Sequence, residues 1–513
     1  MINITLEEFK SLAKKFNLIP IYEEILSDTD TPVSTFIKMT KENPNYCFLL
    51  ESVVDAERWG RFSFLSFSPK QIYEIRGNEF YTLIPEIKVI KTEAPFYELK
   101  KIMSRYISPE FDDLPRFWGG LVGYAGYEVV KEFETIPDIK KEKKQFNINL
   151  PDSIFVLTEI LIIFDHFKNK TKIVACIDLT DKKFNESLEE KYISGCKKIS
   201  ETIKQIKTGI VQENNYSLTL VEKIKKNKLF KKINSNILKK EFILNVLKAK
   251  KYIYNGDIIQ VVLSQRFSRK TFTFPFDIYR FLRIVNPSPY MYYLNFGDFQ
   301  LIGSSPEILV RKENKFIEIR PIAGTKPRGK NQEEEKELEK ELLNSKKEKA
   351  EHIMLVDLGR NDIGKVAKFG SIKIPNLMVI EKYSHVMHLV SSVTGEIKQD
   401  YDSFDLFKAC FPAGTVSGAP KIRAMEIISE LEPNYRGPYA GAVGYFSYSG
   451  NMDMAINIRT ILYKNNVAYI QAGAGIVADS IVEKEYQEIK NKAKALFSAI
   501  DLTEKYYEEK LKQ

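Results

Sequence analysis

The chain has 513 residues, of which 44% are hydrophobic and 12% aromatic, so it can bury a large core and is not disordered throughout. This length suits two to four average domains or one large composite domain. The net charge of +9 comes from lysines that gather at Lys140–Lys144 and between Lys223 and Lys251, a pattern typical of solvated faces or charged linkers. Arginine and aromatic residues do not alternate with these lysines, so nucleic-acid binding is only a weak alternative.

The first 205 residues are predicted to open with a helix near Leu6–Phe16 and to continue mainly as strands. Short runs rich in β-branched and aromatic residues, bounded by turn residues, indicate those strands. They are Tyr46–Leu50, Arg61–Ser66, Gln71–Arg76 and Ile154–Phe164. Around Lys204–Lys239 the chain becomes rich in lysine and asparagine with little periodicity, which predicts a surface connection that is partly helical.

From about Lys240 onward, long amphipathic helices alternate with strands. The predicted helices are Lys240–Asn255, Asn331–Val356, Lys421–Leu431 and Glu483–Leu496. The predicted strands are Ile258–Arg269, Tyr292–Phe296, Leu301–Ser304, Leu309–Lys312, Phe316–Arg320, Ala440–Tyr448, Met452–Tyr463 and Val467–Val477.

Two short turns between these strands favour hairpins. Gly297 with Asp298 forms one, and Lys464, Asn465 and Asn466 form the other. Consecutive hairpins with long covering helices predict an α+β fold with large antiparallel sheets, and not a doubly wound parallel sheet.

The cysteines and the termini indicate the compartment. Cys47, Cys176, Cys196 and Cys410 are scattered, with no C-x-x-C pair, so neither a zinc site nor a disulfide framework is predicted. The N-terminus lacks a signal-peptide pattern, and the most apolar run, Ile154–Phe164, is too short to span a bilayer. We therefore expect a cytoplasmic protein with no membrane partner.

Two pairs of glutamates carry the strongest chemical signal. Glu348 and Glu351 are three residues apart in a predicted helix, as are Glu485 and Glu488. Residues i and i+3 share one helix face, so two such faces turned toward each other would gather up to four carboxylates. These repel one another unless a divalent cation lies among them, and oxygen ligands favour a hard ion such as Mg²⁺. Either pair alone is more typical of a solvated helix.

Two glycine-rich loops are candidate ligand sites. In Pro412–Lys421, free N–H groups at the start of a helix, with the hydroxyls of Thr415 and Ser417, suit an anion. In Gln471–Ile476, glycines at a strand end let backbone amides approach a carboxylate closely. A tight turn is the alternative for each loop.

Three further side chains have suitable chemistry. His388 has an imidazole that can donate a proton near pH 7, although a lone histidine is more often structural. In a strand, His385 would point to the opposite face. Arg459 is predicted on a half-buried strand, where a substrate carboxylate would be its bidentate partner, and Tyr439 precedes the same sheet.

Several long motifs, in order, resemble the chorismate-utilising enzymes, with the nearest likeness to anthranilate synthase component I. The motifs are Ile319–Thr325, Glu351–Asp362, Pro412–Lys421 and Gln471–Tyr486, and weaker matches reach back to Leu49. The resemblance implies that family's fold, an α+β structure whose large antiparallel sheets lie in an α/β/β/α sandwich. It also implies three regions: 1–205 contributes a tryptophan feedback site, 206–239 is a basic connection, and 240–505 is the chorismate-binding catalytic domain.

The resemblance also implies roles for individual residues. Glu351 and Glu488 would bind Mg²⁺, supported by Glu348 and Glu485, and the metal would hold the ring carboxylate of chorismate. Arg459, Tyr439 and the amides near Gly473 and Gly475 would hold the enolpyruvyl carboxylate, with Lys492 adding positive charge. His388 would assist departure of the ring hydroxyl, Glu307 would move protons, and Thr325 and Thr415 would line the ring pocket.

Two positions separate this chain from sister enzymes. Related enzymes that add water to chorismate carry a lysine base where this chain has Gln260, and a neutral amide cannot activate water. Aminodeoxychorismate synthases carry a nucleophilic lysine where this chain has Ala323, which cannot form a covalent adduct. The expected reaction is therefore chorismate plus ammonia to anthranilate plus pyruvate, with aminodeoxychorismate synthase component I as the alternative.

The motifs Leu49–Ser52 and Asn286–Tyr292 resemble the tryptophan feedback site of the same family. The residues implicated in binding are Ser52, Glu51, Pro289, Tyr290 and Met291. Glu51 would hold the ammonium group, with Pro289 and Met291 against the indole. A strand edge and a proline-rich turn are the alternative.

The chain departs from the family pattern at two places and lacks one motif. Lys326 stands where the family often has arginine, so bidentate geometry is lost there. Ile481 and Val482 replace a usually polar pair. No cysteine lies in a glycine-rich nucleophile turn, so we expect a separate glutamine amidotransferase subunit and a hetero-oligomer. A regulatory amino-acid-binding protein with a decayed active site is the rival from another class.

Overall fold

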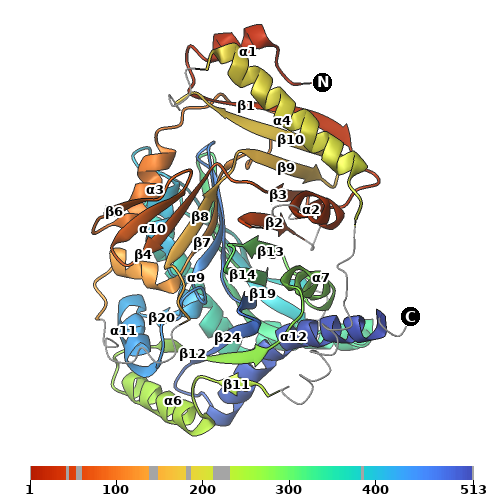
Figure 1. Cartoon of the computed structure of the whole chain (residues 1–513). Coiled ribbons are helices and arrows are strands. Elements are labelled where there is room, and N and C mark those ends of the chain that lie inside the picture. Colours follow the sequence, from red (N-terminus) through yellow and green to blue (C-terminus); the bar gives the residue numbers. More distant parts are fainter. Residues whose placement is uncertain are drawn as a thin grey trace.

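The continuous apolar runs of the sequence form the central strands of two large sheets (Figure 1). The computed structural model describes residues 2–41, 45–52, 60–137, 148–180, 186–211, 232–382 and 386–510. Strands in the middle of each sheet, such as β9 (Ile160–Asp165) and β21 (Ala442–Ser447), are buried along their whole length. Both faces of these strands are therefore covered, which is why their sequences do not alternate.

The first sheet has twelve strands in the described residues, and every pairing is antiparallel. Their order is β1 (Leu18–Leu26), β10 (Lys170–Asp178), β9, β3 (Phe62–Ser66), β2 (Cys47–Glu51), β13 (Tyr290–Asn295), β14 (Phe299–Ser305), β23 (Thr460–Lys464), β24 (Val467–Ile476), β12 (Gln260–Lys270) and β11 (Asn234–Ser235), with β20 (Gly418–Ala419) also beside β12.

The second sheet has twelve described strands and is likewise antiparallel. Their order is β17 (Ile322–Pro327), β19 (Val386–Glu396), β16 (Phe316–Ile319), β15 (Ile308–Glu313), β22 (Met452–Ile456), β21, β7 (Gly120–Ala125), β8 (Ser153–Leu157), β4 (Gln71–Arg76), β5 (Glu79–Ile84) and β6 (Lys88–Lys91), with β18 (Lys373–Lys382) on the other side of β19.

Helices cover one face of each sheet. Against the first sheet or its helices pack α1 (Leu6–Leu12), α2 (Pro32–Thr40), α4 (Leu188–Thr208), α6 (Lys239–Tyr254), α7 (Pro275–Val285), α11 (Lys421–Leu431) and α12 (Val482–Lys510). Against the second pack α3 (Pro95–Met103), α8 (Gln332–Asn344), α9 (Lys346–Gly364) and α10 (Ser403–Cys410). Two short 3₁₀ helices, η1 (Tyr127–Glu132) and η4 (Gly414–Val416), lie in connections.

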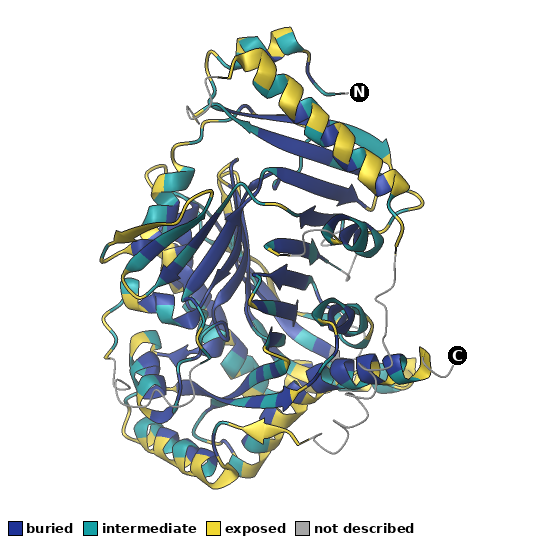
Figure 2. Ribbon diagram, viewed as in Figure 1, coloured by how far each residue is buried: buried dark blue, intermediate teal, exposed yellow. Residues whose placement is uncertain are grey.

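The two sheets face each other through aromatic side chains. The ring of Phe64 on β3 lies 6.2 Å from that of Tyr445 on β21, and Tyr124 on β7 lies 5.7 Å from Phe296, which follows β13. Burial is deepest along these central strands (Figure 2). The α+β fold with layered antiparallel sheets predicted from the sequence is confirmed.

Two predicted strands are wrong in the same way. The run Ile154–Phe164 is two strands, β8 in the second sheet and β9 in the first. The run Met452–Tyr463 is also two strands, β22 in the second sheet and β23 in the first. Since the strands are buried on both faces, the apolar pattern continues through each passage between sheets and hides it.

One predicted helix, Asn331–Val356, is two helices that meet at Ser345. The Ser345 side chain accepts a hydrogen bond from the amide of Glu348 at 3.3 Å and caps α9. The predicted helix Glu483–Leu496 is confirmed within α12, which runs on to Lys510. The other predicted helices and strands, and both hairpins, agree with the structure to within a few residues.

The division of the chain into 1–205, 206–239 and 240–505 stays a prediction and describes only the order along the sequence. In the structure, strands from both sides of the connection share each sheet. Strand β2 pairs with β13, and β7 pairs with β21. The cluster Lys140–Lys144, most of the connection 206–239, and His385 lie outside the described residues.

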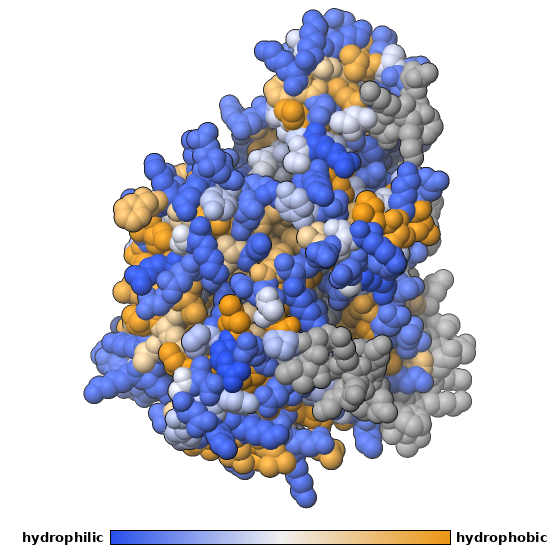
Figure 3. All heavy atoms as spheres, turned by 90° about the vertical axis from the view of Figure 1, so that its left-hand side faces the viewer, coloured by the Kyte–Doolittle hydropathy of each residue, from blue (hydrophilic) through white to orange (hydrophobic). Residues whose placement is uncertain are grey.

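The surface on the side of α3 and α11 is mostly hydrophilic, with apolar side chains scattered among polar ones (Figure 3). No described helix is long and apolar enough to cross a membrane. The four cysteines are free.

Candidate active site

Two passages between the sheets bring together two of the predicted site residues. Glu307 lies between β14 and β15, and Arg459 lies between β22 and β23. The amide of Ile456 donates to the carbonyl of Glu307 at 3.0 Å, and that of Ser304 donates to the carbonyl of Arg459 at 3.1 Å. The two passages are therefore hydrogen-bonded side by side. The prediction that Arg459 lies within a strand is wrong, because it has a left-handed backbone, with φ of +52°, at the crossing.

Arg459 is half-buried, and its guanidinium feels the charges of Glu488 and Tyr439. Burial lowers the pKa of its guanidinium, while the charge of Glu488 and the phenol of Tyr439 act in the opposite direction. The positive charge of Arg459 in turn contributes to a lowered pKa of His388. A half-buried guanidinium in such a place suits an anionic ligand.

His388 lies on β19 opposite Thr325 of β17. Its Nδ1 is 3.0 Å from the carbonyl oxygen of Gly324 and 3.0 Å from the hydroxyl of Thr325. Since a carbonyl only accepts, Nδ1 carries the hydrogen, and a proton given to a ligand must come from Nε2. Burial is the main cause of the lowered pKa of His388, so an imidazolium formed there gives up its proton readily.

Glu307 is buried and held beside Thr415 of η4. Burial raises the pKa of its carboxyl to about 8, against smaller opposing effects of the Thr415 hydroxyl and the Lys492 ammonium. A carboxyl with that pKa is protonated at neutral pH and can give or take a proton during a reaction. The loop Pro412–Lys421 therefore contributes Thr415 to the site, whereas the Ser417 hydroxyl bonds the carbonyl of Ala413 within the loop at 2.8 Å.

The glycines of β24 make room for their neighbours. A Cβ on Gly473 would lie 2.6 Å from the Tyr439 hydroxyl and 3.0 Å from the carbonyl oxygen of Leu263. A Cβ on Gly475 would collide with the Gln260 amide. The Gln260 Nε2 also lies 3.4 Å from the Glu351 carboxylate. Tyr439 and Gln260 therefore lie on the same face of β24, and Gln260 reaches from there to the glutamates.

The two glutamate pairs approach each other from α9 and α12. Burial raises the pKa of Glu351, and the negative charges of Glu348 and Glu488 add to that effect. Burial also raises the pKa of Glu485, with Glu488 contributing. In the described part of the chain, no group of three or more carboxylate, imidazole or thiol side chains lies close enough to hold a metal ion.

Lys492 joins α12 to the first sheet. Its ammonium lies 2.6 Å from Oε1 of Glu488 and donates to the carbonyl of Gly473 at 3.0 Å. The predicted active-site residues on β17, β19, β24, α9 and α12 therefore lie in one region. The residues at the two passages between the sheets, Glu307 and Arg459, lie in the same region.

A buried ion pair that the sequence prediction missed supports this region. Arg436 donates to both carboxylate oxygens of Glu432, to the carbonyl of Val416 beside Thr415, and to the carbonyl of Val262 on β12. Its guanidinium also lies 5.5 Å from the ring of Tyr439. Neither Arg436 nor Glu432 stands in a chemical motif, so the importance of this ion pair becomes clear only from its burial in the structure.

The two departures have visible settings. Lys326 bonds Glu341 of α8 at 2.8 Å, away from the glutamate pairs. Ile481 is half exposed before α12, and Val482 opens that helix. The positions of Glu485 and Glu488 on α12 do not depend on a polar pair there.

A small cavity of about 70 Å³ lies between β2, β13 and β21. All five residues predicted to bind tryptophan line it, namely Glu51, Ser52, Pro289, Tyr290 and Met291. The hydroxyl of Ser52 is buried and has no hydrogen-bond partner among the described residues. Glu51 and Met291 are paired across the two strands.

The charged groups around this cavity are already paired. The Glu51 carboxylate accepts from the Tyr279 hydroxyl at 2.5 Å and from Nη2 of Arg283 at 3.1 Å. Across the cavity, Asp453 accepts from Arg116, Arg311 and the Tyr290 hydroxyl at about 3 Å. A ligand there would meet two guanidinium groups that share one carboxylate.

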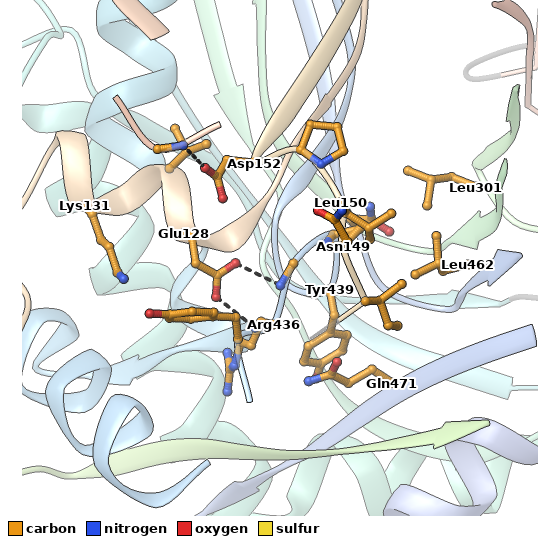
Figure 4. A pocket seen from close by; sticks show the side chains of 18 of the residues that line it. Glu128, Lys131, Asn149, Leu150, Asp152, Leu301, Arg436, Tyr439, Leu462 and Gln471 are labelled. Atoms are coloured by element: carbon orange, nitrogen blue, oxygen red, sulfur yellow. Dashed lines mark hydrogen bonds between the residues drawn. The ribbon is translucent and has the colours of Figure 1, made fainter. Parts of the chain in front are cut away.

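A larger cavity, about 590 Å³, lies next to the gathered residues and reaches Tyr439 (Figure 4). Glu128, Lys131 and Asp152 line one side, and Leu301 and Leu462 line the other. Its volume is within the usual range of small-molecule sites.

Comparison with known proteins identifies the family. Residues 86–498 match the family model described as chorismate binding enzyme. The chain is 48% identical to anthranilate synthase component 1 of Aquifex aeolicus (strain VF5) over 99% of this chain and 100% of that one. It resembles the crystal structure of anthranilate synthase component I from Streptococcus pneumoniae TIGR4 with a TM-score of 0.73 and 36% identity, over 92% of this chain and 99% of that one.

The menaquinone-specific isochorismate synthase of Escherichia coli shares the fold, with a TM-score of 0.68 and 18% identity over 96% of this chain and 98% of that one. The family match spans most of the chain, and the likeness to the Aquifex protein extends over nearly all of it. The chain belongs to the family of chorismate-binding enzymes.

Proposed function

We propose that this chain is the large component of an anthranilate synthase. It converts chorismate and ammonia to anthranilate, pyruvate and water. Ammonia adds at ring C2 as the C4 hydroxyl leaves, and elimination of pyruvate then makes the ring aromatic. The observation that carries this proposal is the meeting of Arg459, His388 and the two glutamate pairs in a chain nearly half identical to a protein named anthranilate synthase component 1.

The substrate's enolpyruvyl carboxylate is held by Arg459. The half-buried guanidinium lies near the Tyr439 phenol, whose pKa burial raises so that it stays a hydrogen-bond donor. Amides near Gly473 and Gly475 bind the same carboxylate, since the absence of a side chain at these positions leaves room beside Tyr439 and Gln260.

A Mg²⁺ ion would be held by Glu351 and Glu488, with Glu348 and Glu485 nearby. The like charges that raise the pKa of Glu351 and Glu485 are what a divalent cation would neutralise, so the donor set fits a hard ion. When bound, the ion supplies positive charge for the ring carboxylate of chorismate. Lys492, now paired with Glu488, contributes charge beside it.

Two residues handle protons. His388 gives a proton from Nε2 to the departing C4 hydroxyl, while Gly324 and Thr325 fix the orientation of its ring. Glu307, with a pKa of about 8, exchanges a proton during the elimination. Thr415 lies beside that carboxyl, has a buried hydroxyl with no hydrogen-bond partner among the described residues, and lines the ring pocket.

Ammonia is favoured over water and over a covalent lysine route. Gln260 is a neutral amide that lies against Glu351, so it offers no base for water. Ala323 lies on β17 two residues before Thr325 and provides no nucleophile. The alternative, aminodeoxychorismate synthase component I, differs in its product, which keeps the enolpyruvyl group.

Tryptophan binding in the smaller cavity and docking of a glutamine amidotransferase subunit belong to the same proposal. The cavity's lining by Ser52, Pro289 and Met291 supports the first. The name of the relatives, anthranilate synthase component 1, supports a second subunit. The complex would be a hetero-oligomer that feeds ammonia to this chain.

Product identification tests the proposal. The purified chain is incubated with chorismate, Mg²⁺ and ammonium, and the products are separated and weighed by mass spectrometry. Anthranilate with an equal amount of pyruvate is expected. An amino product that retains the enolpyruvyl group would support the alternative, aminodeoxychorismate synthase component I. Unchanged chorismate would support a protein with a decayed active site.

The Mg²⁺ assignment is tested with Glu351→Gln and Glu488→Gln. Each is expected to raise the Mg²⁺ concentration needed for half-maximal rate by at least about tenfold, because one charged ligand is lost. The matched control is Glu430→Gln on α11, whose carboxylate bonds Tyr252 at 2.7 Å away from the site. Equal Mg²⁺ requirement in all variants would refute the assignment.

A further inference from the structure

The cavity of about 590 Å³ has exposed residues at its outer end and reaches Tyr439, at the edge of the candidate active site (Figure 4). Its rim includes the exposed residues Gly77, Lys131 and Asn149, and its inner wall includes the buried residues Leu301 and Tyr439. The inner end is therefore formed by one of the residues expected to hold chorismate.

Strand β24 connects this cavity to the site. Tyr469, Gln471, Gly473 and Gly475 alternate along the strand and lie on one face of it. The first two line the cavity, and the last two belong to the candidate active site. The Tyr439 hydroxyl, next to Gly473, marks the boundary between them.

The outer part of the cavity is acidic. Glu128 accepts from the amides of Arg436 and Gly437, each at 2.8 Å, Glu132 accepts from an amide of α3 at 2.8 Å, and Asp152 accepts from that of Gly77 at 2.6 Å. The charge of Asp152 adds to burial in raising the pKa of Glu132 to about 7. Exposed Glu93 and Lys131 also lie on the rim, and the guanidinium groups of Arg266 and Arg436 line the cavity farther in, where both are hydrogen-bonded within the protein.

The inner part offers a hydrogen-bond donor. Asn457 is completely buried and lines the cavity. Its side-chain oxygen accepts from the Tyr292 hydroxyl at 3.1 Å, and its side-chain nitrogen has no hydrogen-bond partner among the described residues. Arg266 there is bonded to Gln471 at 3.0 Å. An amide donor suits a small neutral molecule with a lone pair.

We propose that this cavity is the entry path of the nitrogen nucleophile, which arrives as ammonium at Glu132 and Asp152 and passes inward as ammonia beside Asn457 and Tyr439. The proton of ammonium goes to one of the carboxylates, so NH₄⁺ and RCOO⁻ become NH₃ and RCOOH. Chorismate, a dianion, is repelled by the acidic outer part and enters elsewhere. This inference rests on the proposed function and assigns a route to its second substrate.

A variant that narrows the path tests the inference. Leu150 is half buried at the cavity rim, so Leu150→Trp fills the opening without replacing a core residue. In the full chain with Mg²⁺, the KM for ammonium is expected to rise roughly tenfold or more, with the KM for chorismate changed less than about twofold. The matched control is Leu244→Trp on the exposed face of α6, which should change neither constant.

A second variant keeps the test decisive if Leu150→Trp unfolds. Glu132→Gln removes one negative charge with little change in shape and should also raise the KM for ammonium. Unchanged ammonium KM in folded variants, or a rise confined to the chorismate KM, would overturn the inference. A wild-type chain that makes no anthranilate from ammonium would instead refute the proposed function itself.

Discussion

The guanidinium of Arg436 and the carboxylate of Glu432 form a buried bidentate pair, with N···O distances of 2.6 and 2.9 Å. The same guanidinium holds the carbonyls of Val416 and Val262, and Glu432 accepts from the amide and the hydroxyl of Ser264 at 2.8 Å. One ion pair thus connects the Thr415 loop, β12 and the segment that carries Tyr439. The candidate site is held in place by groups that would not touch the substrate.

Arg436→Gln is expected to lower the free energy of unfolding by about 3–5 kcal/mol, because Glu432 would be left as a buried, uncompensated charge. Denaturant unfolding followed by circular dichroism measures this loss. The matched control is Arg423→Gln, whose partners Asp257 and Glu426 lie in a half-exposed ion-pair cluster. That change should cost less than about 1 kcal/mol. Equal losses would contradict the role given to the buried pair.

Gly473→Ala is expected to reduce kcat/KM for chorismate by about a hundredfold, because the new methyl group displaces the Tyr439 hydroxyl and crowds the carbonyl of Leu263. Steady-state kinetics measure it. Gly364→Ala is the control, since a Cβ there meets nothing closer than 3.7 Å. If both variants kept wild-type kinetics, close packing of β24 against the substrate would be ruled out.

Glu307→Gln should have two separate effects. We expect kcat to fall by about 10²–10⁴, as for loss of an acid–base group. The stability of the wild type relative to the variant should also depend on pH. Burial raises the pKa of Glu307 from 4.5 to about 8, so between these values the unfolded chain releases a proton that the folded chain keeps.

The sign of the pH effect follows directly. As pH rises from about 4.5 to about 8, wild-type stability falls relative to Glu307→Gln, by a few kcal/mol in total, and the difference is constant above that range. Thermal unfolding of both proteins across this pH range measures the difference. A difference that did not change with pH would mean that Glu307 is not a buried, neutral carboxyl.

Ser52→Phe is expected to abolish inhibition by tryptophan while leaving kcat with ammonium within about twofold of wild type, because the ring fills the cavity of about 70 Å³. Rate measurements over a range of tryptophan concentrations test this. Ser104→Phe, at an exposed position after α3, is the control. Inhibition retained in Ser52→Phe would place the regulatory site elsewhere.

Much of the architecture could be predicted because local signals agree with it. The turn at Gly297 and Asp298 joins a hairpin, and the amphipathic pattern of α6 and α11 marks real helices. The sequence also contains signals of helix starts that the prediction did not include. Pro32, Pro95 and Pro275 each stand in the first turn of a helix, and Ser345 with Glu348 has the spacing of a capping box.

The rest depends on three-dimensional packing. Arg459 could be placed near a carboxylate site but not at a crossing between sheets, because the strands on either side of it, β22 and β23, are both mainly apolar and mainly buried. Arg436 and Glu432 gain their importance only from segments distant in sequence that meet around them. The large cavity likewise combines η1, the 148–152 segment and β24, which no local pattern relates.

The central claim is that this chain makes anthranilate from chorismate and ammonia with the help of Mg²⁺. The most direct measurement follows anthranilate fluorescence after the purified chain is mixed with chorismate and ammonium at mildly alkaline pH, with Mg²⁺ and then with excess chelator. Fluorescence that grows with Mg²⁺ and stops with chelator is the expected result. Chorismate that stays unchanged under both conditions would contradict the claim.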